Sequence, residues 1–280
     1  MPSEYMIRPQ KGVAIFRFGE LPRYRDLLVI LTQRDLFRAY KQSILGPLWF
    51  FIQPLFTAIV FTVIFGQVAK LSTDGTPKFL FYLCGNMCWS LFSTSFSGIS
   101  GTFINNQQIF GKIYFPRIIA PISNIIVNST RFLVQFMIFI ICFVYYYYVG
   151  AIEIHVSFLS VVAIVGAIFC IIVQAAGFGF IMAAATTKYR DLKYAQGFLI
   201  QLWMFATPVI YPLSMIPAGS RFWAAFNPLT PVFEIFRWAV LGTGTISLWH
   251  CVASGLATLF VVLVGAAMFA RVEKNFIDIV

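Results

Sequence analysis

The sequence predicts an all-helical integral membrane protein with six membrane-spanning helices. Of its 280 residues 60% are hydrophobic and only 11% are charged, and the mean hydropathy is +0.84. Soluble domains usually carry about 25% charged residues, so this class is excluded. Several apolar runs reach the ~20 residues that a helix needs to cross a bilayer. We therefore expect one membrane domain, residues 47–280, preceded by a cytoplasmic tail and an interfacial helix within residues 1–46.

The segment before the first apolar run has the pattern of a helix that lies in the membrane surface. Over residues 21–44, helical spacing places a cationic stripe beside an apolar stripe a quarter turn away. The cationic stripe contains Arg34, Arg38 and Lys41, and the apolar stripe contains Phe37, Tyr40 and Ile44. An ordinary surface helix is the alternative, but the apolar runs that follow favour the membrane surface. Since the first run begins near Pro47, behind a charged tail, no cleavable signal peptide is expected.

Six later segments are predicted to span the membrane. They cover residues 47–66, 79–100, 118–148, 158–185, 195–211 and 249–270. The stretch 228–241 is too short to span and contains Glu234 and Arg237, so it predicts a re-entrant hairpin at the outer face between the fifth and sixth spans.

The distribution of positive charge predicts the orientation. Six spans place both termini on one side, and that side would carry 15 of the 20 Lys and Arg residues. The positive-inside rule then places both termini in the cytoplasm. The net charge of +10 thus reflects membrane topology, and no nucleic-acid partner is expected.

The chemistry of the side chains argues against an enzyme or an ion-coupled carrier. None of the six predicted spans contains a carboxylate, whereas ion-coupled carriers normally need ion sites near the midplane. Cys84 and Cys88 lie one helical turn apart, but no His or carboxylate is near them in sequence, so no metal site is expected. A nucleotide-binding P-loop is also missing, because Asn106 stands where the first glycine before Gly111 and Lys112 would be. If transport is driven by ATP, a separate ATPase chain would bind the ATP and Mg²⁺, and this chain would hold no cofactor.

One cytoplasmic segment, residues 105–117, is predicted to dock such a partner. It reads NNQQIFGKIYFPR, a polar turn followed by an aromatic and basic stretch. We expect Ile109, Phe110, Tyr114 and Phe115 to be exposed, and exposed apolar side chains of this kind often mark an interaction site. A plain solvated loop is the alternative.

An ordered set of short motifs resembles the permease subunits that export O-antigen and related polysaccharides, within the type-2 ABC-transporter permeases. The resemblance covers about residues 24–270. Its motifs are Arg34-Asp35, Tyr40-Lys41-Gln42-Ser43, Leu45-Gly46 with Trp49, Tyr114-Phe115-Pro116-Arg117, Tyr189-Arg190-Asp191, Thr207-Pro208-Val209-Ile210-Tyr211-Pro212, Asn227-Pro228 and Phe236-Arg237.

The resemblance implies a homodimer that forms a continuous channel, with each chain bound to one copy of a separate ATPase. The ATPase would contact the interfacial helix at residues 34–41. It would also contact the loop between spans two and three, through Gln107, Gln108, Ile109, Phe110, Lys112 and Tyr114. Residues 213–241 would form gate helices at the outer face. The predicted gate residues are Pro212, Asn227, Pro228, Glu234 and Arg237.

The implied cargo is a glycan linked to a polyprenyl diphosphate. Arg34, Arg38 and Lys41 could bind that diphosphate at head-group level, although contact with anionic lipids would explain them as well. A translocation path lined by aromatic rings and few charged side chains would let a sugar polymer slide. The candidate residues for lining it are Trp89, Phe92, Trp203, Phe205 and Tyr211. Packing or contact with lipid is the alternative for these rings. Arg131 departs from the neutral or acidic residue of the family, and either contact with cargo or snorkelling would explain it.

The sequence therefore predicts a permease subunit in a bacterial inner membrane that moves a lipid-linked polysaccharide of the O-antigen type from the cytoplasmic to the periplasmic side. Teichoic acid, capsule or a hydrophobic drug are alternative cargoes for the same architecture. A membrane enzyme of polyprenyl-phosphate metabolism and a non-catalytic scaffold are alternatives from other classes.

Overall fold

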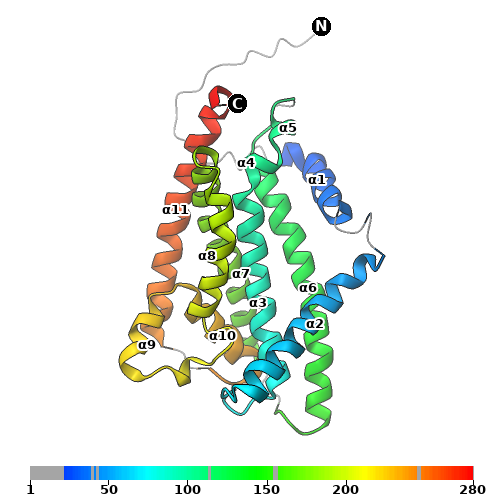
Figure 1. Ribbon diagram of the computed structural model, residues 1–280, viewed down its shortest axis with the longest axis vertical. Helices are drawn as coiled ribbons and strands as arrows, with labels where there is room; N and C mark the ends of the chain where they lie inside the picture. The colour runs from blue at the N-terminus through cyan, green and yellow to red at the C-terminus, as the bar shows by residue number, and fades with distance from the viewer. Residues whose placement is uncertain are drawn as a thin grey trace.

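The computed structural model describes residues 22–38, 41, 44–112, 115–153, 157–244 and 247–279, and within these residues every regular element is helical. The elements are α1 (Arg25–Arg38), η2 (Gly46–Leu48), α2 (Trp49–Phe61), η3 (Thr62–Val68), α3 (Lys78–Ser100), α4 (Thr102–Asn105), α5 (Gln107–Phe110), α6 (Ile119–Tyr148), α7 (Phe158–Lys188), α8 (Leu192–Ala206), η4 (Leu213–Met215), α9 (Ala218–Ala225), α10 (Leu229–Leu241) and α11 (Leu248–Ile279). The long helices form an elongated bundle (Figure 1).

Four segments of the described chain are long and apolar enough to cross a membrane. They are α2 with the π-helical turn η3 (Trp49–Val68), α6, α7 and the part of α11 up to Glu273. The predicted boundaries of the spans at 118–148 and 158–185 differ from α6 and α7 by no more than three residues. The protein is therefore a multi-pass membrane protein.

Helix α3, which was predicted as the second span, lies in the middle of the bundle. It packs against α2, α6 and α7 (Figure 1), and most of its side chains are buried. Its many Ser, Thr and Gly residues make it less apolar than the four segments above. Because α3 faces other helices, small polar side chains suit it by allowing close helix packing.

Helix α8 differs from the predicted fifth span at 195–211. It begins at Leu192 and ends at Ala206, so at 1.5 Å per residue it is about 22 Å long. Pro208 explains the early end, since the residue before a proline is disfavoured in the helical region and Thr207 has φ −103° and ψ 142°. Residues 207–212 instead form a non-helical corner, which we call the outer corner.

Helix α1 is shorter than the interfacial helix expected over residues 21–44. It ends at Arg38, and Ile44 lies at a bend just before Gly46, which has φ +48°. One side of α1 packs on α6, where Leu31 is buried and Thr32 Oγ1 donates a hydrogen bond to Ser123 Oγ at 3.2 Å. The other side exposes Val29, Ile30 and Phe37. Tyr40, which was expected on the apolar stripe, lies outside the described residues.

The two ends of the bundle differ in their helices (Figure 1). Helices α1, α4 and α5 lie at one end with the C-terminal end of α11, whereas α9 and α10 lie at the other. A cluster of buried rings underlies the first end and includes Phe103, Phe110, Phe115, Phe180 and Phe269. The expectation that Phe110 and Phe115 would be exposed is therefore wrong, since they are only 9% and 5% exposed. Their rings pack on each other, and Phe110 also packs on Phe103, whose ring lies against Phe269 of α11.

Candidate functional site

A buried ion pair holds α10 against the outer corner. Arg237 Nη1 lies 2.9 Å from Glu234 Oε1, and both side chains are only 2% exposed. Arg237 Nη2 also donates to the carbonyl oxygen of Pro208 at 2.7 Å, and its guanidinium carbon lies 4.1 Å from the centre of the Phe81 ring on α3. These contacts join α10, α3 and the outer corner. Two of the predicted gate residues are thus packed and paired inside the chain.

Asn227, another predicted gate residue, connects the end of α8 to the start of α10. Its amide nitrogen donates to Thr207 Oγ1 at 2.8 Å and to the Ala206 carbonyl at 3.2 Å. Its amide oxygen accepts from Trp203 Nε1 at 3.1 Å and from the Leu229 backbone N–H at 3.2 Å. One side chain therefore bonds to both helices that flank it.

The remaining predicted gate residues, Pro212 and Pro228, lie beside this connection. Pro212 is buried. The Pro228 carbonyl accepts from Gln174 Nε2 on α7 at 3.0 Å and from Ser254 Oγ on α11 at 2.5 Å. Asn227, Pro228 and Arg237 therefore connect α10 and the residues before it to α7, α8, α11 and the outer corner. Glu234 pairs with Arg237, and Pro212 is the last residue of the outer corner.

An Asn227→Ala variant is expected to unfold at a lower temperature, because it leaves the Trp203 indole N–H and a helix-terminal backbone N–H without this acceptor. A donor or acceptor left unsatisfied in a buried position typically costs about 1–3 kcal/mol. Since the bonds of Asn227 to Trp203 and Leu229 are part-buried, we expect the lower end of this range. The apparent unfolding midpoint in detergent measures this change. Trp203→Phe removes the same indole bond, so the double variant should lose less than the sum of the two single losses. Fully additive losses would show that the bond contributes nothing.

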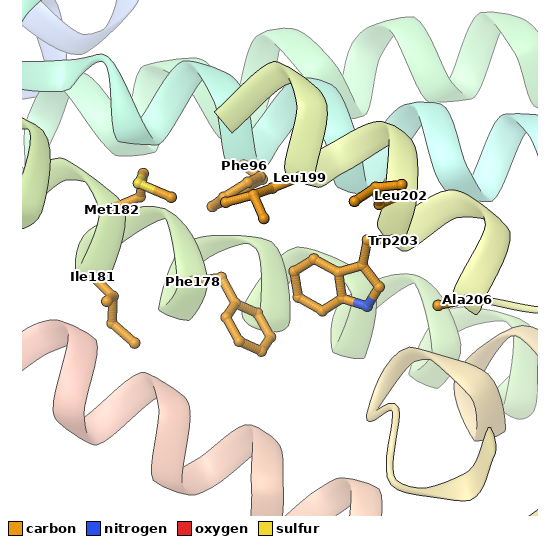
Figure 2. Close-up of a pocket in the computed structure, with 8 residues that line it drawn as sticks. All are labelled: Phe96, Phe178, Ile181, Met182, Leu199, Leu202, Trp203 and Ala206. Atoms are coloured by element: carbon orange, nitrogen blue, oxygen red, sulfur yellow. The ribbon is translucent and has the colours of Figure 1, made fainter. Parts of the chain in front are cut away.

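An apolar cavity of about 420 Å³ lies between α7 and α8. Figure 2 shows the side chains that surround it, with Phe178 and Ile181 on α7 and Leu199 and Trp203 on α8. Phe178 and Trp203 meet edge to face, with 4.7 Å between ring centres. Since no charged side chain lines this cavity, it suits an apolar ligand or another helix.

The five aromatic residues predicted to line a path occupy different environments. Trp89 and Phe92 are 6% and 0% exposed, so in a single chain they pack inside the bundle. Trp203 packs against Phe92, with 5.1 Å between their ring centres. Phe205 is 49% exposed on α8, and Tyr211 is half-buried with its hydroxyl donating to the Phe205 carbonyl at 2.9 Å. Of these five residues, Phe205 is the most exposed in a single chain.

Of the three predicted cationic residues, Arg34 is fixed by neighbours. Its Nη2 lies 2.8 Å from Asp35 Oδ1 and donates to Asn106 Oδ1 on the α4–α5 connection at 3.2 Å. Lys41 is exposed just beyond the end of α1, and the side chain of Arg38 lies outside the described residues. Arg34 therefore faces the bundle, and the cationic stripe stays a prediction.

Arg34 lines a polar cavity of about 280 Å³ between α1, the α3–α4 segment and α6. We call it the arginine pocket, because Arg131 of α6 lines it as well. The other polar side chains that line it are Asp35, Thr102, Asn105, Asn106, Asn124 and Asn128. No shared site of these asparagines was predicted from the sequence. A signal for part of the set was present, since Asn124, Asn128 and Arg131 are four and three residues apart, which is one face of a helix.

The predicted docking segment is exposed only in its polar part. Gln107, Gln108 and Lys112 are exposed, Ile109 is half-buried, Phe110 is buried, and Tyr114 lies outside the described residues. The end of this segment is joined to α11, because the Arg117 backbone N–H donates to Glu273 Oε1 at 2.9 Å and the Arg117 side chain donates to the Glu273 carbonyl.

Comparison with known proteins identifies the family. The model of the ABC-2 type transporter family matches residues 26–241. An O-antigen export system permease protein RfbA of Myxococcus xanthus is 31% identical over 221 residues, which cover 78% of this chain and 81% of that protein. An RfbA of the same description from Klebsiella pneumoniae is 29% identical over 91% of this chain and 95% of that protein.

A more distant relative has a different named cargo. The polysialic acid transport protein KpsM of Escherichia coli is 24% identical over 87% of this chain and 92% of that protein. The resemblance seen in the sequence motifs is thus confirmed. This chain belongs to the ABC-2 type transporter family.

Proposed function

We propose that this chain is the membrane-spanning subunit of an ATP-driven exporter that moves a polyprenyl-diphosphate-linked polysaccharide of the O-antigen type across a bacterial inner membrane. The observation that carries this proposal is the similarity to two O-antigen export permeases over 81% and 95% of their lengths. A capsule-like polymer is the second candidate cargo, since the KpsM relative is named for polysialic acid transport.

Six spans with cytoplasmic termini agree with the arrangement of the helices. In Figure 1, α2, α3, α6, α7, α8 and α11 run in alternate directions along the bundle, with α2 tilted and beginning about half-way along it. The end that holds α1, α4 and α5 also holds the C-terminal ends of α7 and α11. Of the 17 Lys and Arg residues in the described chain, 12 lie in these segments, in the connections next to them or at the start of α8. By the positive-inside rule this end faces the cytoplasm. Helices α9 and α10 then form the re-entrant hairpin at the periplasmic side, where they act as the outer gate.

A homodimer with a shared path is the proposed transport unit. Helix α8 contacts the rest of its chain mainly through α7 and α3, while Tyr194, Phe198 and Phe205 are exposed on it. A second copy of α8 could cover these rings, and Phe205 would then border the path of the polymer. Trp89, Phe92, Trp203 and Tyr211 would support this wall from behind.

The separate ATPase is proposed to dock at α5. Here Gln107, Gln108 and Lys112 are exposed, whereas the rings beneath them are buried. Through the bonds between Arg117 and Glu273, movement at this surface would reach α11 directly. One copy of the ATPase would bind each chain and hold the ATP and Mg²⁺, while Arg34, Arg38 and Lys41 would meet the lipid diphosphate nearby.

When the chain is purified together with its partner, we expect a Gln108→Glu, Lys112→Glu double variant to recover at least tenfold less bound ATPase protein than the wild type does. The substitutions place two negative charges on an exposed surface, and a mismatched charge at an interface weakens association; tenfold corresponds to about 1.4 kcal/mol. Lys70→Glu at the opposite end of the bundle is the control. Equal recovery of ATPase with the wild type, the double variant and Lys70→Glu would show that the partner docks elsewhere.

Deletion of the gene in its host tests the proposed function. Lipid-linked polymer should accumulate on the cytoplasmic leaflet and disappear from the cell surface, and the wild-type chain should restore export. Normal surface polymer in the deletion strain would contradict the proposal and favour the drug-export or scaffold alternatives.

A further inference from the structure

The arginine pocket is a positively charged cavity beside the apolar span Trp49–Val68. Two guanidinium groups line it, those of Arg34 and Arg131, whereas Asp35 is the one carboxylate in its lining. Asp35 is already paired with Arg34 at 2.8 Å. The lining therefore has one positive charge more than it has negative charge, which favours an anionic ligand.

The pocket lies beside the start of the apolar span Trp49–Val68. Arg131 is the thirteenth residue of α6, so its position in the sequence alone suggests the membrane interior. However, its guanidinium carbon lies 5.2 Å from the centre of the Phe50 ring, and Phe50 is the second residue of the apolar span Trp49–Val68. Arg131 thus lies at the end of that span, and the first half of α6 extends beyond it on the side of α1.

The polar groups in the pocket are positioned by one another. Asn128 Nδ2 donates to Asn124 Oδ1 at 2.9 Å, and Arg131 Nη1 lies 3.5 Å from Asn128 Oδ1. Across the pocket, Arg34 Nη2 donates to Asn106 Oδ1. Gly98 makes room for this arrangement, since a Cβ atom there would lie only 2.0 Å from Asn124 Nδ2.

We propose that the arginine pocket binds the phosphate group of a lipid and that, resting on the proposed function, this group is the diphosphate of the cargo lipid. Guanidinium groups bind phosphate oxygens in a bidentate manner, and asparagine amides can donate further hydrogen bonds. The volume of about 280 Å³ lies just below the range of ~300–1,000 Å³ for small-molecule sites, so the pocket suits a head group rather than a glycan. The exposed side chains of Leu48 and Trp49, next to Phe50, offer an apolar surface for the prenyl chain.

Binding of geranylgeranyl diphosphate to the purified full-length chain in detergent tests this proposal. The dissociation constant should rise at least tenfold in Arg131→Gln, because a charged donor is lost. It should rise by a smaller factor in Gly98→Ala, where the new methyl group displaces Asn124. Arg25→Gln is the matched control, since Arg25 carries the same charge on α1 but is exposed outside the pocket, and it should bind like the wild type.

Two competitors distinguish the source of the phosphate. Inorganic diphosphate and phosphatidylglycerol should each displace the probe much more weakly than unlabelled geranylgeranyl diphosphate does. Equal displacement by inorganic diphosphate would overturn the lipid assignment, and equal displacement by phosphatidylglycerol would make this a site for resident lipid. Unchanged affinity in a folded Arg131→Gln or Gly98→Ala protein, as judged by its elution and unfolding midpoint, would overturn the pocket itself.

Failure of this inference can be told from failure of the proposed function. If the deletion strain exports polymer normally while Arg131→Gln still loses binding, the function is wrong and the phosphate site stands. If export requires the chain but Arg131→Gln binds the probe and exports normally, the function stands and the pocket assignment is wrong.

Discussion

An Arg237→Met variant is expected to yield little folded protein, because it leaves the Glu234 carboxylate in a buried position without its cationic partner. The ion pair is 2% exposed on both sides, and the guanidinium also bonds to the Pro208 carbonyl and lies over Phe81. Removing one partner of a buried pair typically costs about 3–5 kcal/mol. Monodisperse yield after detergent extraction and the apparent unfolding midpoint measure the loss.

Two further variants separate the buried charge from loss of charge in general. The double variant Glu234→Gln, Arg237→Met removes both charges, so it should recover part of the yield. Arg271→Met removes a cation from an exposed position on α11 and should behave like the wild type. If Arg237→Met folds as well as Arg271→Met, the pair does not hold α10 in place.

A Gly265→Leu variant is expected to disrupt the packing of α7 on α11. A Cβ atom at Gly265 would lie 2.4 Å from the Gly177 carbonyl oxygen and 3.2 Å from Phe180 Cβ. The obstacle is backbone, so the helices themselves must separate, and overpacking of this kind costs about 1–3 kcal/mol or more. We expect a clear fall in the unfolding midpoint and in the yield of folded protein.

Gly255→Leu is the matched control for this prediction. Gly255 lies on the same helix, and a Cβ atom there would meet no atom within 4 Å. The control should therefore keep the wild-type midpoint. Similar midpoints for the two leucine variants would show that close contact between α7 and α11 is not needed.

The long helices could be predicted from the sequence because their signal is local. The lengths of the apolar runs and the charges beside them predicted where α6, α7 and α11 begin to within a few residues. The amino-acid composition of α3 alone did not predict that it is the central helix, since its burial depends on which helices surround it. The early end of α8 could have been read from Pro208, which disfavours helix at the preceding residue.

The site was harder to predict, since its parts come from distant segments. The motif residues Asn227, Glu234 and Arg237 were singled out, but their bonds to Thr207 and Pro208 depend on tertiary packing. Arg34 and Arg131 are far apart in sequence, and they line the same pocket because α1 packs on α6. Phe110 and Phe115 were expected to be exposed because their packing on each other and on Phe103 has no local signal in the sequence.

ATP-dependent translocation in inverted inner-membrane vesicles tests the central claim most directly. Such vesicles, prepared with this chain and its ATPase and supplied with labelled lipid-linked polysaccharide on the outside, would be treated with a glycan hydrolase after incubation. Polymer should become protected from the hydrolase when ATP is present, and not with a non-hydrolysable analogue or in vesicles that lack this chain. Equal protection with and without this chain would contradict the account, since export would then not depend on it.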